Sequence, residues 1–402
     1  MERLAIVLSA VACLPAVAQT TTRAEEIQEE RRRKQASLAP DETAGIERAL
    51  QQIKEYKILE RFTAGIAGFR LRLGGLATGS GFAIGPEYLR RDLADGKYTF
   101  RASTMLSTRS WYLQEVQFSA PHLLQDSAFF DLSAVHRNFG SLNYYGPGQD
   151  SRKTGRSNFR LEDTDFSATA GIRPFKNVVA AATGGYLLVN AGPGIDSRFA
   201  SADQIYTEAT TPGLTQQTNF LHAGGVLQYD YRDNPGGPRR GGNYFANFNY
   251  YLDRDLNQFS FRRLNLEAQQ YFPFFHERRV IALRARSATT YAGSGQRVPF
   301  YLQPVLGGSD DLRGFRPFRF YGDNLLLMNA EYRWETFSGL DAALFFDAGK
   351  VYDRRSQLNL HDLETSYGFG LRANVRNNVF LRVDVGFSRE GFQVWLKFNN
   401  VF

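Results

Sequence analysis

Three charged residues in the C-terminal third of this chain could form one ionic contact. Glu331 and Asp347 lie in two consecutive segments, 324–334 and 340–350, in which apolar and polar side chains alternate. Alternate side chains of a β-strand point to opposite faces, so both carboxylates are expected on the polar face of one sheet. Arg313, in the preceding loop, carries a guanidinium that can fork hydrogen bonds to carboxylates. The alternative is three independent charges in water, where an exposed pair contributes only about 0–1 kcal/mol.

Other kinds of chemistry find little support in the residue patterns. No Gly-x-Ser-x-Gly motif is present, and Gly79-Ser80-Gly81 lacks the spacing of a nucleophile elbow. The 5 histidines are scattered, without the paired spacing of a metal site. The Gly- and Pro-rich turn at 233–242 precedes no helix, so it is not a phosphate-binding loop. We expect no enzyme activity, catalytic residue, cofactor or metal, with a hydrolase built on barrel strands as the minor alternative.

The last twelve residues show the pattern of a strand with one apolar face. Apolar residues fall at every second position, interrupted once by Asn400: Phe392, Val394, Leu396, Phe398 and Phe402. An exposed apolar edge would promote aggregation of a soluble protein. In a membrane β-barrel the same set faces lipid, and the edge closes against the first strand. The pattern therefore favours a barrel over a soluble sandwich.

The first residues have the features of an exported protein. A short charged start is followed by an apolar run from Leu4 to Val17 and by small residues ending at Ala18. This run is too short to span a membrane, and it predicts a signal peptide at 1–18. Lipidation at Cys13, the single cysteine, is the alternative. Removal of the signal would leave no cysteine for a disulfide.

Residues 19–60 form a separate charged region with Tyr56 as its only aromatic residue. After Pro40, apolar residues recur at helical spacing, which predicts an amphipathic helix at 41–58. Its length of roughly 27 Å is near the height of a barrel, so it could plug the lumen. We expect instead that it packs on the periplasmic rim.

From residue 61 to 402 the hydrophobic pattern has a period of two. Short connections alternate with long ones, as in barrels with short periplasmic turns and long external loops. We expect sixteen strands, an even number as in bacterial barrels. They are expected near 63–73, 80–89, 97–108, 111–119, 127–139, 158–173, 178–189, 219–230, 243–252, 258–271, 279–290, 324–334, 340–350, 364–375, 379–387 and 391–402. The sequence thus predicts an all-β fold, a 16-stranded antiparallel transmembrane β-barrel with a short N-terminal helical segment.

The composition is consistent with a membrane barrel. The 33 Phe, 20 Tyr and 37 Gly, with a slightly negative mean hydropathy of −0.37, fit half-apolar strands flanked by aromatic residues. The net charge of +7 is modest, and basic residues stand singly on alternate strand positions. That arrangement suits a solvated lumen better than a phosphate-binding surface, so we expect outer-membrane lipids and no nucleic acid as partners.

The first expected strand is rich in glycine. Gly65, Gly68, Gly74 and Gly75 lie in or beside it, and glycine weakens strand pairing. We therefore expect fewer hydrogen bonds between the first and last strands than between other neighbours.

Several motifs in this frame together resemble one known family. Leu306-Gly-Gly-Ser-Asp-Asp-Leu-Arg-Gly-Phe315 lies in the sixth external loop, and Asn329-Ala-Glu-Tyr-Arg333 follows it. The next strand carries Phe345-Phe-Asp-Ala-Gly-Lys-Val-Tyr352, and Tyr144-Tyr-Gly-Pro-Gly148 and the turn at 229–242 stand upstream. In this order, with a terminal Phe, they resemble the barrel of the BamA/TamA outer-membrane assembly superfamily, also called the bacterial surface antigen family.

The resemblance implies a location, a function and a set of site residues. Such barrels act in the outer membrane of Gram-negative bacteria in protein assembly, secretion or lipid transfer, and client barrel or secreted proteins would be partners. It implies that the sixth loop folds into the barrel, with a loop-lock motif of Leu312, Arg313, Gly314, Phe315, Glu331, Asp347 and Gly349. It also implies a C-terminal assembly signal, Phe398 and Phe402. A solute-conducting outer-membrane channel is the alternative function.

Two features depart from the family pattern. Members usually carry periplasmic POTRA domains ahead of the barrel, and residues 19–60 are too few for one, so we expect a member without them. Leu312 stands where Val or Ile is usual. The client proteins, the oligomeric state and any accessory partners are not predicted by the sequence.

Overall fold

The computed structural model describes residues 67–375, 378–398 and 402. The signal peptide expected at 1–18, the charged region at 19–60 and the helix at 41–58 lie outside the described residues. Among those that are described, no helix is long and apolar enough to cross a membrane.

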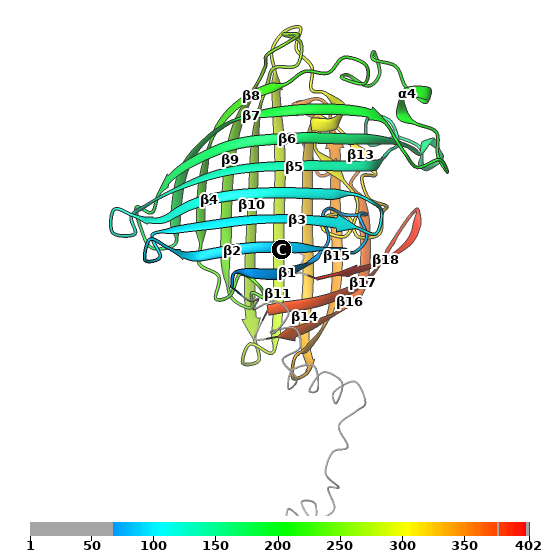
Figure 1. Ribbon diagram of the computed structural model, residues 1–402. Helices are drawn as coiled ribbons and strands as arrows, with labels where there is room; N and C mark the ends of the chain where they lie inside the picture. Colours follow the sequence, from blue (N-terminus) through cyan, green and yellow to red (C-terminus); the bar gives the residue numbers. More distant parts are fainter. Residues whose placement is uncertain (1–66, 376–377, 399–401) are drawn as a thin grey trace, which may run out of the picture. The chain divides into compact units, whose positions relative to one another are not determined.

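In the described residues, sixteen antiparallel strands form one sheet in which each strand pairs with its neighbours in the strand order (Figure 1). The strands are β1 (Phe69–Gly74), β2 (Ala83–Leu93), β3 (Tyr98–Ser107), β4 (Tyr112–Leu123), β5 (Ala128–Tyr144), β6 (Ser157–Ile172), β7 (Val178–Pro193), β8 (Phe220–Asp230), β9 (Gly241–Asp253), β10 (Phe261–Phe274), β11 (Arg279–Ala292), β14 (Asn324–Phe337), β15 (Leu340–Tyr352), β16 (Glu364–Val375), β17 (Asn378–Ser388) and β18 (Gly391–Lys397). The sheet curls into a nearly closed barrel. The prediction of a 16-stranded antiparallel barrel is confirmed.

The connections differ in length at the two ends of the barrel. The long ones, 145–156, 194–219, 293–323 and 353–363, all lie at one end, which we call the long-loop end. They contain η1 (Lys153–Gly155), α4 (Ala202–Ile205), η2 (Phe300–Leu302), η3 (Arg355–Gln357) and a small sheet of β12 (Val305–Leu306) and β13 (Phe320–Tyr321). The opposite end, which we call the short-turn end, has turns such as 275–278.

The two faces of the sheet follow the alternation in the sequence. In β15, Leu344 and Phe346 are 52% and 50% exposed on the outer face, whereas Asp347, which follows Phe346, has no exposed surface. In β14, Glu331 is buried on the inner face. The predicted orientation of these strands is therefore confirmed.

Strand β5 is longer than predicted. It reaches Tyr144 instead of ending near 139, because its inner face continues into an aromatic core at the long-loop end. The ring of Phe300, in the long connection, lies 5.2 Å from that of Tyr144 and 4.7 Å from that of Phe159. Gly140 and Ser141 interrupt the alternation of apolar and polar residues, so the sequence pattern predicted that the strand ends before them. The core anchors the connection 293–323 against the inner wall.

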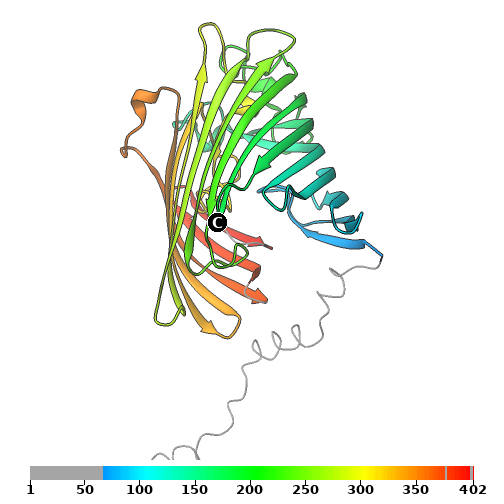
Figure 2. The ribbon, with the colours of Figure 1, turned by 90° about the vertical axis from the view of Figure 1, so that its left-hand side faces the viewer.

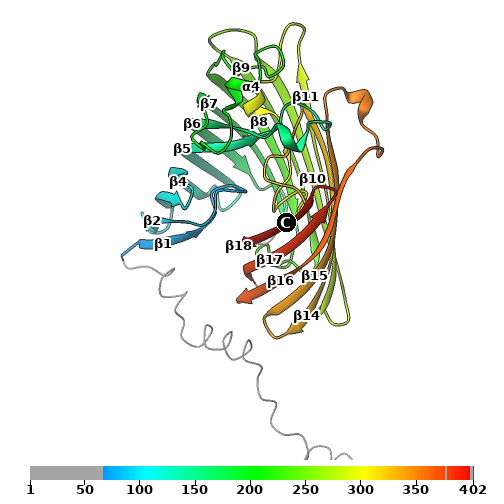
Figure 3. The same ribbon diagram turned by 90° about the vertical axis from the view of Figure 1, so that its right-hand side faces the viewer.

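The first and last strands of the sheet do not pair in the described residues. The strand order begins with β1 and ends with β18, and these two strands flank an opening that we call the seam (Figures 2 and 3). The rings of Phe82 and Phe398 meet across the seam with centroids 5.4 Å apart. The predicted weak closure is confirmed for the described residues, and strand β18 ends at Lys397.

The C-terminal residue corrects one prediction. Phe402 was expected on the outer, lipid-facing side with Phe398, but it is 7% exposed and packs against inner-face residues Tyr271, Val280 and Ala282. The guanidinium carbons of Arg284 and Arg333 lie 5.8 and 5.4 Å from its ring centroid. A cation over an aromatic ring is attracted by the ring's negative face, which explains the inward placement. That Phe398 and Phe402 form an assembly signal stays a prediction.

Amide hydrogen exchange should detect the seam. Strands that pair on one side only open more easily than those paired on both sides. We expect the amides of β1 and β18 to exchange faster than those of β10 and β11 when the protein is measured by mass spectrometry in detergent micelles. Equal protection of all four strands would show that the seam is closed.

Candidate functional site

The connection between β11 and β14 folds into the barrel, as the sequence motif implied. Leu312 and Phe315 have no exposed surface. They pack against apolar inner-face residues of the wall and the loop: Ala288, Leu306, Phe320, Leu325, Leu327 and Val351. Burying a Leu or Phe side chain contributes about 1.5–3 kcal/mol, so this cluster holds the loop tip on the wall.

Glycines make the close approach of loop and wall possible. A Cβ added to Gly314 would lie 2.5 Å from the backbone oxygen of Phe387 in β17. Gly386 faces the loop from the other side, because its added Cβ would overlap the backbone oxygen of Arg313. A Cβ on Gly349 would lie 2.8 Å from the backbone oxygen of Leu326. Gly386 was missed by the sequence reasoning.

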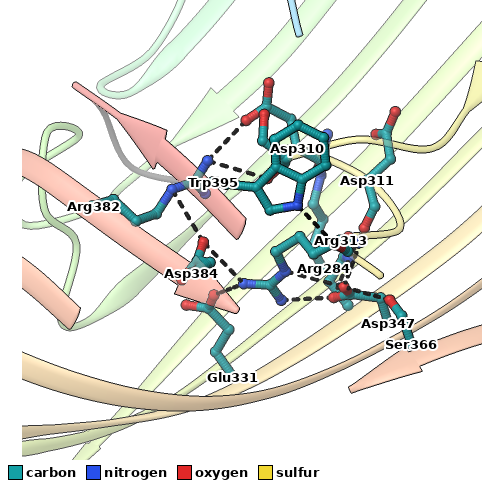
Figure 4. A network of polar contacts seen from close by, with 12 residues as sticks. Arg284, Asp310, Asp311, Arg313, Glu331, Asp347, Ser366, Arg382, Asp384 and Trp395 are labelled. Atoms are coloured by element: carbon teal, nitrogen blue, oxygen red, sulfur yellow. Dashed lines mark hydrogen bonds and ion pairs between the residues drawn. The ribbon is translucent and has the colours of Figure 1, made fainter. Parts of the chain in front are cut away.

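Arg313 connects the loop tip to two strands of the wall (Figure 4). Its Nε and Nη2 donate to the carboxylate of Asp347 at 3.0 and 2.6 Å, and its backbone N–H donates to Asp347 at 3.1 Å. Its Nη1 donates to Glu331, and its guanidinium carbon lies 3.5 Å from the ring centroid of Phe345. The expected contact of Arg313 with Glu331 and Asp347 is present, and we call these three residues the loop lock.

The electrostatics of the loop lock keep its charges in place. Arg313, Glu331 and Asp347 have no exposed side-chain surface. Burial by itself would lower the pKa of Arg313, but Asp347 and Glu331 raise it above its ordinary value, so the guanidinium remains charged. A buried charge needs such partners, because an unpaired one is very costly.

Further side chains complete the hydrogen bonding of the two carboxylates. Asn329 and Ser366 donate to Asp347 at 2.8 and 3.1 Å. Arg372 donates to Glu331 at 2.9 Å and to Asp384 at 2.7 Å. Alternation alone places Arg372 and Asp384 on the inner face, but only the register of β15, β16 and β17 shows that they join the loop lock. The sequence reasoning therefore missed them.

The loop tip also touches both sides of the seam. Asp310 accepts hydrogen bonds from Thr78, after β1, at 3.1 Å and from Arg382 in β17 at 3.0 Å. The Nζ of Lys397 in β18 lies 3.6 Å from Asp310, and Trp395 Nε1 donates to the backbone oxygen of Arg313 at 2.7 Å. Burial would raise the pKa of Asp310, but Lys397 and Arg382 hold it below its usual value. The ionised loop thus connects the segment after β1 with β18, which does not pair with β1 in the described residues.

The two upstream motifs support the same arrangement. Tyr144 is buried in the aromatic core, and Gly148 N–H donates to the backbone oxygen of Tyr321 at 2.8 Å, at the return of the loop. At the short-turn end, Arg239 in the 229–242 turn donates to both carboxylate oxygens of Asp341 at 2.9 Å. The first motif therefore stabilises the loop, and the second stabilises the short-turn end.

No metal site accompanies the loop lock. Among residues 67–375, 378–398 and 402, no group of three or more His, Cys, Asp or Glu side chains could hold a metal ion. The carboxylates of the loop lock instead accept hydrogen bonds from arginines.

Removing the guanidinium should destabilise the loop while the strand ladder stays. Arg313→Ala leaves Asp347 without its main cation, and removing one partner of a buried pair costs about 3–5 kcal/mol. We expect a lower unfolding temperature in heat-modifiability gels, with Arg313→Lys intermediate because an ammonium cannot fork two bonds. Arg240→Ala, at a 65% exposed side chain, is the matched control and should behave as wild type. A wild-type transition in Arg313→Ala would contradict the coupling.

A methyl group at Gly314 should displace the loop. The nearest atoms to an added Cβ belong to the backbone of Phe387, which the strand ladder holds in place. Overpacking costs about 1–3 kcal/mol, and about 1.4 kcal/mol of strain already corresponds to tenfold more displaced loop. We therefore expect trypsin to cleave the loop about tenfold faster in Gly314→Ala.

The control for this experiment is Gly184→Ala, where the nearest atom to the added Cβ is 3.7 Å away. That variant should keep the wild-type cleavage rate. Equal resistance of Gly314→Ala would mean that the loop is not held against β17.

Comparison with known proteins identifies a family and a related fold. The Omp85 superfamily domain model matches residues 96–388. BamA from Haemophilus ducreyi lacking POTRA domains 1–3 has a TM-score of 0.64 at 14% identity, over 83% of this chain and 70% of that chain. CdiB from Escherichia coli has a TM-score of 0.54 at 14% identity, over 83% of this chain and 62% of that chain. A search of curated proteins by sequence gives no match.

At 14% identity, the two solved structures show a shared barrel fold. The family match spans most of the barrel strands, from the turn before β3 to the end of β17. The predicted resemblance is confirmed: this chain belongs to the Omp85 superfamily.

Proposed function

We propose that this protein is an outer-membrane barrel of the insertase or translocase type. It acts in outer-membrane protein assembly, secretion or lipid transfer, with other barrel or secreted proteins as clients. The observation that carries the proposal is the loop lock beside an unpaired seam, because the same loop contacts the wall, β18 and the connection after β1.

The outer face supports a location in a membrane. Leu344, Phe346 and Leu396 are all at least half exposed on that face, and many other large apolar side chains are exposed with them. Exposed apolar surface of this extent is unfavourable in water and favourable against lipid hydrocarbon. The short-turn end then faces the periplasm and the long-loop end faces outwards, as in other bacterial barrels.

The seam supplies a physical route for clients. An unpaired strand edge presents free backbone N–H and C=O groups, which pair readily with another extended chain. The edges of β1 and β18 at the seam have this character in the described residues. The loop lock would set how far the two edges separate, since Asp310 contacts both sides.

The contents of the barrel argue against the alternative of an open solute channel. The loop tip and its apolar cluster occupy the interior, and its arginines are neutralised by carboxylates. A channel needs a water-filled constriction lined by free charges. The described residues around the loop lock instead form a packed, paired interior.

Depletion of the protein, followed by quantitative proteomics of the outer membrane, tests the function. We expect selective loss of particular barrel or secreted proteins, because their insertion or export would depend on this barrel. Wild-type protein should restore them. Arg313→Ala should be present as a barrel and restore less than a tenth, since losing more than about 1.4 kcal/mol of loop anchoring is a tenfold effect.

Arg254→Gln, at an exposed arginine of the β9–β10 turn, is the control and should restore fully. An unchanged outer-membrane proteome, together with ion conductance of the wild type in planar bilayers, would contradict the proposal and favour the channel.

A further inference from the structure

A cavity of about 510 Å³ lies at the seam, next to the loop lock. Arg72 and Leu73 of β1 line it from one side, and Leu396 and Lys397 of β18 line it from the other. Consecutive residues of a strand point to opposite faces. A cavity lined by both members of each pair therefore passes through the barrel wall, where strand pairing is missing. We call it the seam pocket.

The inner end of the seam pocket is cationic. Arg72 and Lys397 line it, and Arg109, in the connection between β3 and β4, also lines the pocket. Arg72 donates to Glu115 at 2.8 Å, and Lys397 lies 3.6 Å from Asp310. Arg109 is exposed, and within residues 67–375, 378–398 and 402 no carboxylate forms an ion pair with it. The pocket thus has more positive than negative charge, unlike the loop lock, where the single arginine has two carboxylate partners.

The outer end of the seam pocket is apolar. Leu396 is 59% exposed and Phe82 is 38% exposed on the outer face, and Leu73 and Phe398 complete this part of the lining. Polar and charged groups therefore gather towards the interior, and hydrocarbon gathers towards the outer surface. A matching ligand needs a charged group at one end and hydrocarbon directly next to it.

We propose that the seam pocket binds a lipid with an anionic phosphate headgroup. The phosphate lies among Arg72, Arg109 and Lys397, and the acyl chains leave along Leu73 and Leu396 into the bilayer. Phosphate oxygens accept charge-assisted hydrogen bonds from arginine and lysine, and buried hydrocarbon adds a favourable contribution for each methylene. The inference rests on the membrane location in the proposed function, and it adds a ligand class that the function does not require.

A lipid fits the seam pocket better than an extended client strand. The volume is within the range of small-molecule sites, about 300–1,000 Å³, and suits a headgroup with the first part of its chains. The Phe82–Phe398 ring contact and the Thr78–Asp310 hydrogen bond cross the seam. An inserted strand has to break both contacts, whereas a lipid entering from the outer face leaves them intact.

One glycine allows the pocket to be filled without disturbing the barrel. A Cβ added to Gly75 would have its nearest atoms at 3.6–3.8 Å, one of them the Nζ of Lys397. These are ordinary contacts, and the backbone at Gly75 is not left-handed. A leucine at this position should therefore extend into the headgroup site while the strands keep their pairing.

Native mass spectrometry of the full chain in detergent tests the site. The probes are phosphatidylglycerol, which is anionic, and phosphatidylcholine, which has the same chains and no net charge. We expect the wild type to retain phosphatidylglycerol preferentially. Arg109→Gln should weaken its binding about fivefold, from the roughly 1 kcal/mol that one cation contributes at a lipid surface. Gly75→Leu should abolish the preference.

Arg254→Gln is the matched control, because it removes an exposed arginine at the same end of the barrel but away from the seam pocket. It should bind as wild type does. Equal retention of both lipids, or equal binding in all variants, would overturn the lipid site. So would retention of a peptide with the sequence of β18 by a wild type that retains neither lipid, which would assign the pocket to a client strand. Each of these results leaves the depletion experiment unaffected, so the two proposals can fail separately.

Discussion

The organisation of this barrel depends on one buried charge, the Arg313 guanidinium. An arginine of a loop can be buried in a protein interior only if carboxylates there pair with it. The free-energy cost of desolvating an unpaired charge is larger than most stabilising contributions. Glu331 and Asp347 supply those carboxylates from adjacent strands. Arg372 and Arg333 also donate to Glu331, and Asn329 and Ser366 also donate to Asp347. The loop therefore has one well-defined docking position, set by hydrogen-bond geometry and by an apolar cluster around Leu312 and Phe315.

The docked loop compensates for incomplete closure of the sheet. In a closed barrel every strand edge is satisfied by its neighbours. Here β1 and β18 do not pair in the described residues, and contacts through Asp310, Trp395 and the Phe82–Phe398 rings replace the missing ladder. Side-chain contacts of this kind can be exchanged one at a time, whereas a ladder breaks cooperatively. A seam held by a loop is thus better suited to opening than a seam held by backbone hydrogen bonds.

The same geometry explains why a cavity remains beside the loop. Glycines at the end of β1 and after it leave space that side chains elsewhere would fill, and the open space at Gly74 and Gly75 borders Lys397. Conversely, Gly314 and Gly386 are positions where two backbones touch and no side chain fits. Glycine therefore acts in two opposite ways around one loop, closing the contact on the β17 side and opening it at the seam.

Alternation along the chain was sufficient to predict the number of strands, their direction and the inner position of Glu331 and Asp347, because side-chain direction in a strand is a local property with a period of two. The Arg313 contact followed from a motif. Other features depend on register and closure, which bring distant residues together: the participation of Arg372 and Asp384, the unpaired seam, the inward Phe402 and the extension of β5. Contacts between residues on different strands leave no pattern in the local sequence. Only the tertiary structure therefore determines which of these residues meet.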